Sequence, residues 1–246
     1  MSLTGWLKRI FRKQRISDPR EAYDVWSQGY DDQPYNLMLN LDEQITGKFL
    51  EEIDLTGKTI ADIGCGTGRH WKKFFSKDPA KLVGFDISPG MLDKLKQKYP
   101  LAETHLLEGN KLSALGNSSC DLVISTLTIA HIENIEEAFA EWNQVLKPGG
   151  DIIITENHPV ALAKGGQRTF RHGGKLLSVR NYIHPIEKMR DLAGQLGWTE
   201  TRFTERIVDD DVIAFYQQQN ALAVYEKFLG VPIIYGIHLK KENDPS

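Results

Sequence analysis

Cysteine is scarce in this chain of 246 residues, which contains only Cys65 and Cys120. Cys65 follows one apolar run and Cys120 precedes another, so in a parallel sheet they would lie at opposite ends of neighbouring strands. At about 3.3 Å per residue this separates them by roughly 15 to 20 Å, which is beyond disulfide reach. Neither cysteine has a partner at C-x-x-C spacing, and we therefore expect two reduced thiols and no metal site.

Long apolar runs are also missing. No stretch approaches the ~20 consecutive apolar residues of a membrane-spanning helix, and no secretory signal is visible. We therefore expect a soluble, cytoplasmic protein. Apolar residues nevertheless make up 41% of the chain. Strand and helix patterns alternate along it, which favours a single α/β domain over residues 18–246.

Positive charge is concentrated at the N-terminus. Residues 1–17 hold five lysines and arginines and no acid, whereas the other 25 cations face all 33 acids, so the remainder has a net charge of −8. The negative net charge of residues 18–246 argues against a nucleic-acid or polyphosphate partner. On one side of a helix predicted within residues 3–15 lie Leu3, Trp6, Leu7, Ile10 and Phe11. This segment is expected either to contact an anionic membrane surface or to pack on the domain, with a joint at residues 17–19.

A glycine-rich motif follows the first strong strand pattern. Residues 59–63 are apolar or β-branched apart from Asp62, and Gly64, Gly66 and Gly68 come directly before a helical pattern. Alternating glycines let a backbone turn sharply and let a ligand touch the main chain. The order of strand, glycine turn and helix therefore predicts a ligand site.

Two features of this motif distinguish its ligand from a dinucleotide. In the dinucleotide motif G-x-G-x-x-G, the third glycine comes one residue later than it does here. Asp62 would also repel a pyrophosphate, whereas it would attract the ammonium and sulfonium of S-adenosylmethionine. The run from Asp62 to Gly68 matches D-x-G-x-G-x-G, and the chain here resembles the class I S-adenosylmethionine-dependent methyltransferases. The resemblance implies S-adenosylmethionine as cofactor and S-adenosylhomocysteine as its product.

The ends of the next strands extend the resemblance. Asp86 ends a second predicted strand, residues 81–86, about 20 residues beyond the glycines, where a carboxylate can accept hydrogen bonds from both ribose hydroxyls. Ser88 is the better cap for the helix that begins near Pro89, which leaves Asp86 available for the ribose. The family usually has an aspartate for the adenine amino group where this chain has Asn110, whose carbonyl oxygen can still accept.

The resemblance also implies further cofactor contacts. Tyr30 lies in an aromatic segment before the first strand and resembles a recurring residue of small-molecule members of the family. The remaining implied contacts adjoin the motifs above or end the fourth strand: Cys65, Ile87, Met91, Lys111 and Thr126.

The predicted fold is a Rossmann-like, doubly wound and mainly parallel sheet of seven strands in the order 3-2-1-4-5-7-6, preceded by helices. Further predicted strands cover residues 104–107, 121–126, 151–155, 199–207 and 232–240, and helices cover 185–196 and 212–229. Residues 158–185 contain Gly173 and Gly174 between two strand patterns. This predicts a β-hairpin insertion after the fifth strand, acting as a lid over the substrate.

Methyl transfer from a sulfonium requires mainly alignment of the acceptor atom, so a catalytic dyad need not exist. His131 and His158 follow the fourth and fifth strands and are the candidate general bases, because histidine titrates near neutral pH. Each has a structural alternative, as a helix cap or as a partner in a loop hydrogen bond.

The segment after the fourth predicted strand limits the class of methyl acceptor. Residues 125–128 read Ser-Thr-Leu-Thr, not the N-P-P-Y-like run that stacks a planar base or amide, and no Pro-Cys pair is present for attack on cytosine. Residues 21–157 resemble a group that includes quinone-biosynthesis C-methyltransferases and carrier-protein carboxyl O-methyltransferases. A small-molecule acceptor, lipid- or quinone-like, is therefore expected.

Two other classes remain as alternatives. A non-catalytic module that binds S-adenosylmethionine would carry the same motifs. An NAD-dependent oxidoreductase would instead need G-x-G-x-x-G without the preceding acid. None of the motifs specifies the atom that is methylated or the oligomeric state.

Overall fold

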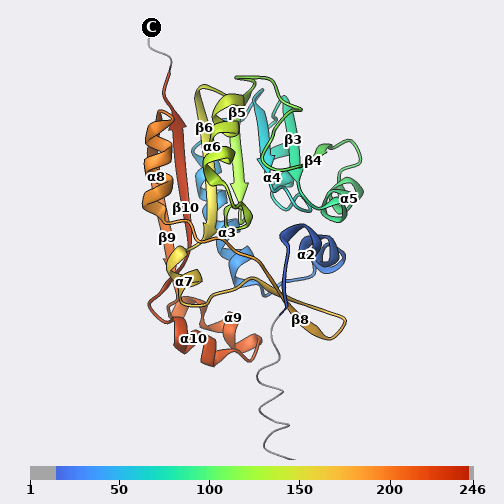
Figure 1. Cartoon of the computed structure of the whole chain (residues 1–246), viewed down its shortest axis with the longest axis vertical. Helices are drawn as coiled ribbons and strands as arrows, with labels where there is room; N and C mark the ends of the chain where they lie inside the picture. The colour runs from blue at the N-terminus through green and yellow to red at the C-terminus, as the bar shows by residue number, and fades with distance from the viewer. Residues whose placement is uncertain (1–14, 244–246) are drawn as a thin grey trace, which may run out of the picture.

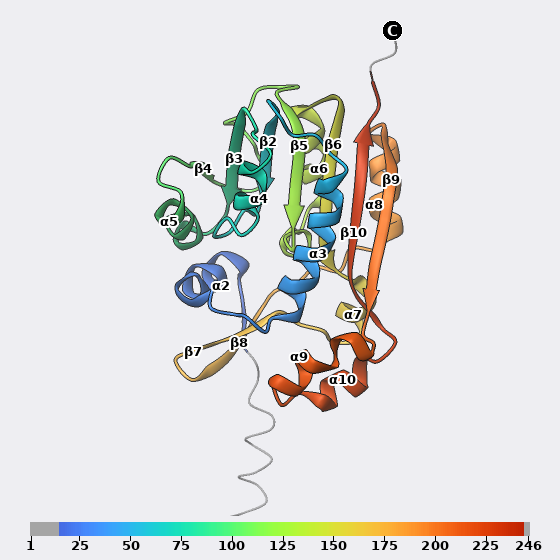
Figure 2. The ribbon, with the colours of Figure 1, turned by 180° about the vertical axis from the view of Figure 1, so that it is seen from behind.

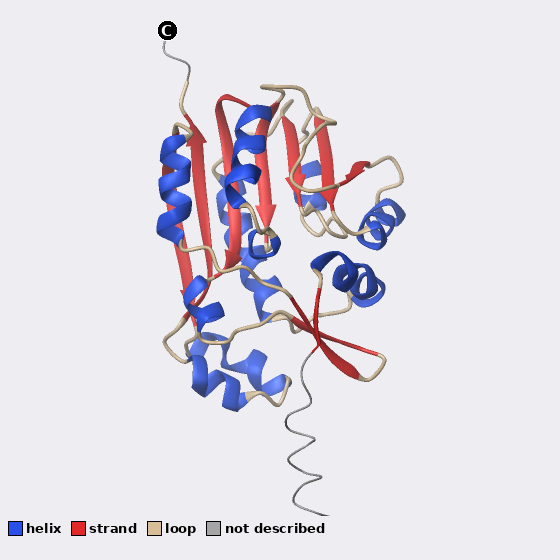
Figure 3. Cartoon of the chain, in the orientation of Figure 1, coloured by secondary structure: helices blue, strands red, loops and turns tan. Residues whose placement is uncertain are grey.

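The computed structural model describes residues 15–243, and its central element is a seven-stranded sheet with helices on both faces (Figure 1, Figure 3). The strand order is β4-β3-β2-β5-β6-β10-β9. Numbered along the chain within this sheet, that order is the predicted 3-2-1-4-5-7-6. β2 to β6 run parallel, whereas β10 is antiparallel to both β6 and β9. The Rossmann-like fold class is confirmed.

Six of the seven strands begin and end within one residue of the predicted positions, whereas the fifth begins five residues earlier than predicted and ends two residues later. The first five are β2 (Thr59–Ile63), β3 (Lys81–Asp86), β4 (Glu103–Leu106), β5 (Cys120–Thr126) and β6 (Leu146–Asn157). The last two are β9 (Trp198–Ile207) and β10 (Pro232–Lys241). Four of the five residues of β2 are buried, as expected for a parallel strand that is covered on both faces.

Helices cover the two faces of the sheet. On one face lie α3 (Leu37–Glu51), α4 (Trp71–Phe75) and α5 (Pro89–Lys98), and on the other α6 (Ile135–Val145) and α8 (Ile186–Gln195). Ser88 caps α5 by accepting a hydrogen bond from the Met91 N–H at 3.1 Å, which confirms its predicted role. α3 lies directly on β10 (Figure 2) because Gly236 has no side chain: a Cβ there would come within 2.4 Å of Ile45.

A second, three-stranded sheet has the order β1-β8-β7. β7 (Thr169–His172) and β8 (Lys175–Val179) form the predicted hairpin, with both turn glycines at positive φ. β1 (Arg15–Ser17) pairs in parallel with β8. The first described residues therefore form a strand of this sheet, and α2 (Pro19–Trp26) begins within the predicted joint at residues 17–19.

One predicted helix is wrong. Residues 212–229 contain two helices, α9 (Ile213–Gln218) and α10 (Leu222–Phe228), separated at Asn220. Asn220 has a φ of 53°, in the left-handed region where an α-helix cannot continue.

The predicted membrane contact of residues 3–15 falls almost wholly outside the described residues, which begin at Arg15. Within residues 15–243, no helix combines the length and the apolar character needed to cross a membrane.

Candidate active site

The loop between β2 and α4 has the backbone that the glycine pattern predicted. Gly64, Gly66 and Gly68 have φ values of 72°, 53° and 74°, in the left-handed region that favours glycine. The N–H groups of Gly64 and Cys65 both donate to the carbonyl of Phe85 on β3. The loop is therefore fixed at the C-terminal ends of two adjacent strands.

Two of these glycines have different surroundings. A Cβ on Gly64 would come within 2.1 Å of the Thr128 hydroxyl, so its missing side chain makes room for the segment after β5. A Cβ on Gly66 would meet nothing within 4 Å, and Gly66 lines a pocket. The open space over its backbone fits a ligand that lies against the main chain.

The pocket has a volume of ≈ 320 Å³ and lies at the C-terminal ends of β2, β3 and β5, where open α/β sheets bind ligands. The predicted site residues that line it are Tyr30, Gly64, Gly66, Asp86, Ile87, Met91, Asn110, Thr126 and His131. The predicted residues outside this lining are Asp62, Cys65, Gly68, Lys111 and His158.

Asp86 faces the pocket at the end of β3. One carboxylate oxygen accepts from the Gly66 N–H and the other from the Ser88 N–H, each at 2.8 Å. The carboxylate is thus not as free as the sequence suggested, but each oxygen keeps a second lone pair for a ribose hydroxyl. Burial raises the pKa of Asp86 to about 6 despite these hydrogen bonds.

Asn110 lines the same pocket after β4. Its Nδ2 group donates to the Asn134 carbonyl at 3.3 Å and to a carboxylate oxygen of Glu137 at 3.1 Å. Because the nitrogen is engaged in this way, Oδ1 is the amide atom left to accept a hydrogen bond from a ligand. This orientation suits the predicted role toward the adenine amino group.

Asp62 occupies a different place from the one expected. Its Oδ2 accepts a hydrogen bond from the Trp71 indole N–H at 2.8 Å, and the side chain is buried and outside the pocket lining. Burial raises its pKa to about 6. The carboxylate therefore joins the end of β2 to α4, and its direct contact with a ligand ammonium stays a prediction.

Three other residues that were predicted to contact the cofactor lie outside the pocket lining. The Cys65 thiol packs against Gly84, where a Cβ would come within 2.9 Å of its sulfur. Burial raises the pKa of this thiol, which opposes its ionisation. Gly68 packs against Leu95, and Lys111 is exposed.

A buried ion-pair network joins the glycine loop to α3. Asp42 on α3 is fully buried and accepts hydrogen bonds from Arg69, His70 and Thr155. Although burial opposes ionisation, the charges of Arg69 and His70 hold the pKa of Asp42 well below its usual range. The network fixes the start of α4 relative to α3 and β6.

Tyr23 and His131 also line the pocket. His131 lies in a turn, η2 (Ile129–His131), and its Nδ1 is 2.9 Å from the carbonyl oxygen of Arg180, so Nδ1 carries the proton. Nε2 then accepts from the Tyr23 hydroxyl at 2.8 Å. Burial and a nearby guanidinium lower the pKa of His131 to about 4, so the imidazole is neutral at pH 7.

The nearby guanidinium belongs to Arg168, which sequence reasoning missed. Its Cζ lies 5.7, 5.5 and 5.9 Å from the ring centroids of Tyr23, Trp26 and Tyr30. Its Nη2 donates to the Tyr30 hydroxyl at 2.8 Å. Two residues further on, Phe170 stacks on Trp26 with centroids 4.6 Å apart. Arg168 thus places a cation against the aromatic side chains of α2 and of Tyr30. No local sequence pattern reveals this pairing.

Glu156, at the end of β6, is a buried acid in the same region. One carboxylate oxygen accepts from the Ala130 N–H at 2.9 Å. The other accepts from the backbone and side-chain N–H groups of Asn157 at 2.5 and 2.6 Å. Burial raises the pKa of Glu156.

The backbone is strained in the turn directly after β5. Leu127 lines the pocket with a φ of 52°, a conformation that is uncommon for leucine. Its N–H donates to the Thr155 carbonyl at 2.8 Å, which holds it in place. Strained residues cluster at functional sites, and this one lies between the predicted cofactor residues and η2.

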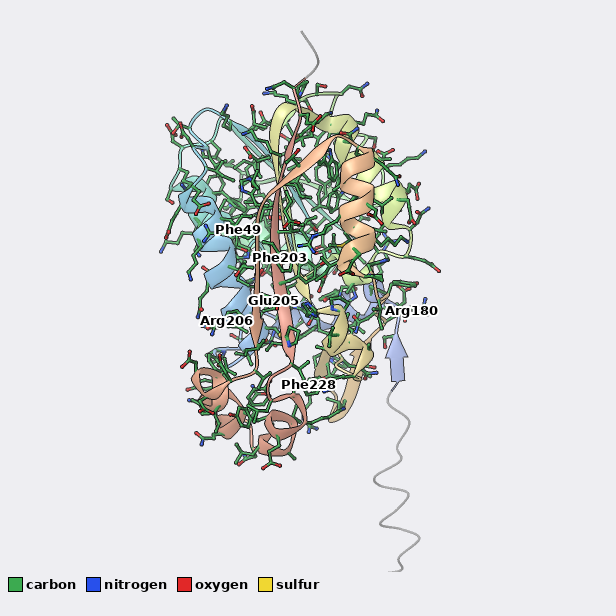
Figure 4. All side chains as sticks on the ribbon, turned by 90° about the vertical axis from the view of Figure 1, so that its left-hand side faces the viewer. Phe49, Arg180, Phe203, Glu205, Arg206 and Phe228 are labelled. Atoms are coloured by element: carbon green, nitrogen blue, oxygen red, sulfur yellow. The ribbon has the colours of Figure 1, made fainter. Side chains whose placement is uncertain are left out.

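His158 lies outside the pocket lining. Its Nδ1 accepts from the Val160 N–H at 3.2 Å and so caps α7 (Pro159–Ala163). Its Nε2 is 3.4 Å from a carboxylate oxygen of Glu205 on β9, which Figure 4 labels. The geometry of His158 thus corresponds to its structural alternative as a helix cap.

Comparisons with known proteins find similarity to methyltransferases. Residues 61–154 match a family model described as a methyltransferase domain. The chain is 26% identical over 175 residues to an uncharacterized protein of Haemophilus influenzae, covering 67% of this chain and 69% of that one. It is 31% identical over 125 residues to the malonyl-[acyl-carrier protein] O-methyltransferase of Hahella chejuensis, covering 49% of this chain and 44% of that one. The match therefore spans less than half the length of this second relative.

A solved structure shares the fold. An S-adenosylmethionine-dependent methyltransferase from Mesorhizobium loti superposes with a TM-score of 0.62 at 18% identity, over 81% of this chain and 98% of that one. The glycine loop, the acid at the end of β3, the strand order and the family model all point to the same cofactor, S-adenosylmethionine. The methyltransferase-domain match over residues 61–154 and the shared fold together support a class I S-adenosylmethionine-dependent methyltransferase.

Proposed function

We propose that this methyltransferase transfers the methyl group to a carboxylate oxygen of a small-molecule acceptor, either free or attached to a carrier protein. The single observation that carries the proposal is that the two side chains that could act as a base toward the acceptor, His131 and Glu156, are already engaged in hydrogen bonds. The malonyl-[acyl-carrier protein] O-methyltransferases among the similar proteins give it further support.

The residues of the pocket support one orientation of the cofactor. We infer that the Asp86 carboxylate accepts from the ribose hydroxyls and that Asn110 Oδ1 accepts from the adenine amino group. The exposed backbone of Gly66 would lie against the methionine portion, and Tyr30 would close over it. The buried side chain of Met91 would supply an apolar contact. Tyr23 and His131 then border the space left for the acceptor.

Bound S-adenosylmethionine supplies a methyl group on a positively charged sulfur, and attack by a carboxylate oxygen forms a C–O bond while the C–S bond breaks and its electron pair stays on sulfur. The acceptor has no proton to lose, so an ester and a neutral thioether form without a base. The chain's own residues are then required mainly to align the two partners.

The available side chains fit such an acceptor better than a phenolic one. Nε2 of His131 accepts from Tyr23, and the pKa of about 4 leaves this imidazole a weak base. Both oxygens of Glu156 are occupied by N–H donors. A quinol-like acceptor, which the sequence also suggested, would need a base to take its hydroxyl proton, whereas a lipid-like acid would not.

The chemical stability of the product tests this proposal. Purified protein would be incubated with methyl-tritiated S-adenosylmethionine and a small-molecule extract, and the product would then be treated with mild alkali. A carboxyl methyl ester releases volatile tritiated methanol under these conditions. Methyl groups on carbon, nitrogen or a phenol stay in the non-volatile fraction, and that result would contradict the proposal. No transfer to any acceptor would favour the non-catalytic alternative.

A further inference from the structure

Arg168 has an unusual environment for a cation. It is the residue before β7, its Nε atom is inaccessible to solvent, and no hydrogen-bond partner for Nε lies among residues 15–243. A guanidinium carries five N–H donors and stays charged under all ordinary conditions, so a buried and unsatisfied donor is costly. A ligand that accepts from this group would remove that cost.

No acid of the described chain neutralises this cation by direct contact. Within residues 15–243, no carboxylate oxygen lies within the 4.0 Å of an ion pair with Arg168. Glu156 is close enough to influence its pKa, but the oxygens of Glu156 accept from Ala130 and Asn157 instead. The immediate neighbours of the guanidinium are the faces of aromatic rings.

Arg168 is not among the residues that line the cofactor pocket, but it contacts two residues that are. Tyr23 and Tyr30, which contact the guanidinium, also line the cofactor pocket. Gln167 and Thr169, the residues on either side of Arg168, line a different groove between the hairpin and α9 and α10. Side chains alternate along an extended segment, so Arg168 and Phe170 face α2 while their neighbours face away. The guanidinium of Arg168 therefore packs against two side chains of the pocket wall, Tyr23 and Tyr30.

We propose that Arg168 is an acceptor-binding residue that holds the carboxylate of the substrate through its Nε N–H and neighbouring donors. This inference rests on the proposed carboxyl methylation and names the residue that recognises the acid. A planar carboxylate matches the fork of a guanidinium and can accept two hydrogen bonds from it.

The charge balance favours a carboxylate over a phosphate. One guanidinium compensates one negative charge, and Asp86 and Glu156 already add negative charge to this region. A phosphate dianion would bring a second negative charge that the single guanidinium of Arg168 does not balance. Methylation also removes the charge that Arg168 recognises, so the ester product should bind more weakly than the acid and leave the site.

Binding of a matched pair of probes tests the proposal. Hexanoate and methyl hexanoate differ only in the charge and the methyl group, and each would be titrated by calorimetry into protein saturated with S-adenosylhomocysteine. For the wild type we expect hexanoate to bind at least tenfold more tightly than its ester. For Arg168→Gln we expect this preference to disappear while S-adenosylhomocysteine still binds. Arg171→Gln, which changes an exposed arginine of the same hairpin, is the matched control and should retain the preference.

A second measurement keeps the test valid if Arg168→Gln does not fold. In the wild-type protein, the Nε–Hε resonance of Arg168, assigned by its loss in Arg168→Lys, should move when hexanoate is added and stay in place with methyl hexanoate. An unchanged resonance, or an equal preference for the acid in wild type and Arg168→Gln, would overturn the inference. Base-stable methyl groups in the labelling experiment would overturn the proposed function instead, so the two failures are distinguishable.

Discussion

Replacing Asp86 by asparagine should weaken the binding of S-adenosylmethionine without unfolding the domain. The substitution keeps the shape of the side chain but removes its charge and turns one acceptor oxygen into a donor. Hydrogen bonds to a charged group contribute about 1.5 to 3 kcal/mol. At 1.36 kcal/mol for each factor of ten, the dissociation constant should rise roughly 10- to 150-fold. The buried N–H groups of Gly66 and Ser88 would compete for the one remaining oxygen, which adds to the loss.

Isothermal titration calorimetry at pH 7.5 measures this change directly. Asp93→Asn is the matched control, because Asp93 is an exposed acid of α5 outside the pocket lining. The control should bind as the wild type does. If Asp86→Asn binds within twofold of the wild type, the assignment of Asp86 to the ribose is refuted.

The raised pKa of Asp86 predicts opposite pH dependences for cofactor binding and for the stability of the fold. Its pKa of about 6 in the folded protein, against 3.8 for an ordinary aspartate, means that it is ionised at pH 7.5 and mostly protonated at pH 5. Cofactor affinity should therefore fall as the pH drops through 6, and Asp86→Asn should lose this part of the dependence. Because the pKa of Asp86 is higher in the folded state than in the unfolded state, the protonated carboxyl stabilises the folded state at low pH. This contribution to the free energy of unfolding is lost as the pH rises from about 4 to 6. Calorimetric titrations between pH 5 and 7.5 check the first point and urea unfolding the second.

Three further changes address other parts of the site. Gly66→Val should abolish measurable binding of S-adenosylmethionine while circular dichroism stays native, because the new side chain would enter the pocket; retained affinity would show that the ligand lies elsewhere. Asp42→Asn should lower the free energy of unfolding by about 3 to 5 kcal/mol, because it removes the buried carboxylate that pairs with Arg69 and His70 and leaves them only the half-exposed Glu43. Urea unfolding measures this loss, and a change below about 1 kcal/mol would contradict the role of the network. Tyr23→Phe should cost about 1 kcal/mol of stability through the hydrogen bond lost at His131, measured by the same method, with unchanged stability arguing against the assigned tautomer.

Much of the fold followed from local patterns. Buried apolar runs ended where the strands end, and the glycine spacing predicted the turn after β2 because positive φ at three alternate positions excludes most other residues. The capping role of Ser88 was equally local, since it depends on residues three positions apart. The break at Asn220 was missed because the apolar pattern continues on both sides of it.

The parts of the site that the sequence did not reveal depend on contacts between distant segments. Arg168 meets Tyr30 across 138 positions, and Asp42 meets Thr155 across 113. Asp62 shows the limit of motif reasoning. Its charge predicted a contact with a cationic ligand, whereas in the structure it accepts a hydrogen bond from Trp71, which depends on the packing of α4 beside β2. The direction of a side chain is a tertiary property, so the residues of a motif could be named before their individual contacts were known.

A crystal structure of the complex with S-adenosylhomocysteine tests the central claim most directly. We predict that the ligand occupies the pocket at the C-terminal ends of β2, β3 and β5, with its ribose hydroxyls on the Asp86 carboxylate, its adenine amino group on Asn110 Oδ1 and its amino-acid portion over Gly66. The sulfur should point toward Tyr23 and His131. A ligand bound in another part of the molecule, or one held with its adenine and methionine ends reversed, would contradict the assignment of the site and the acceptor space derived from it.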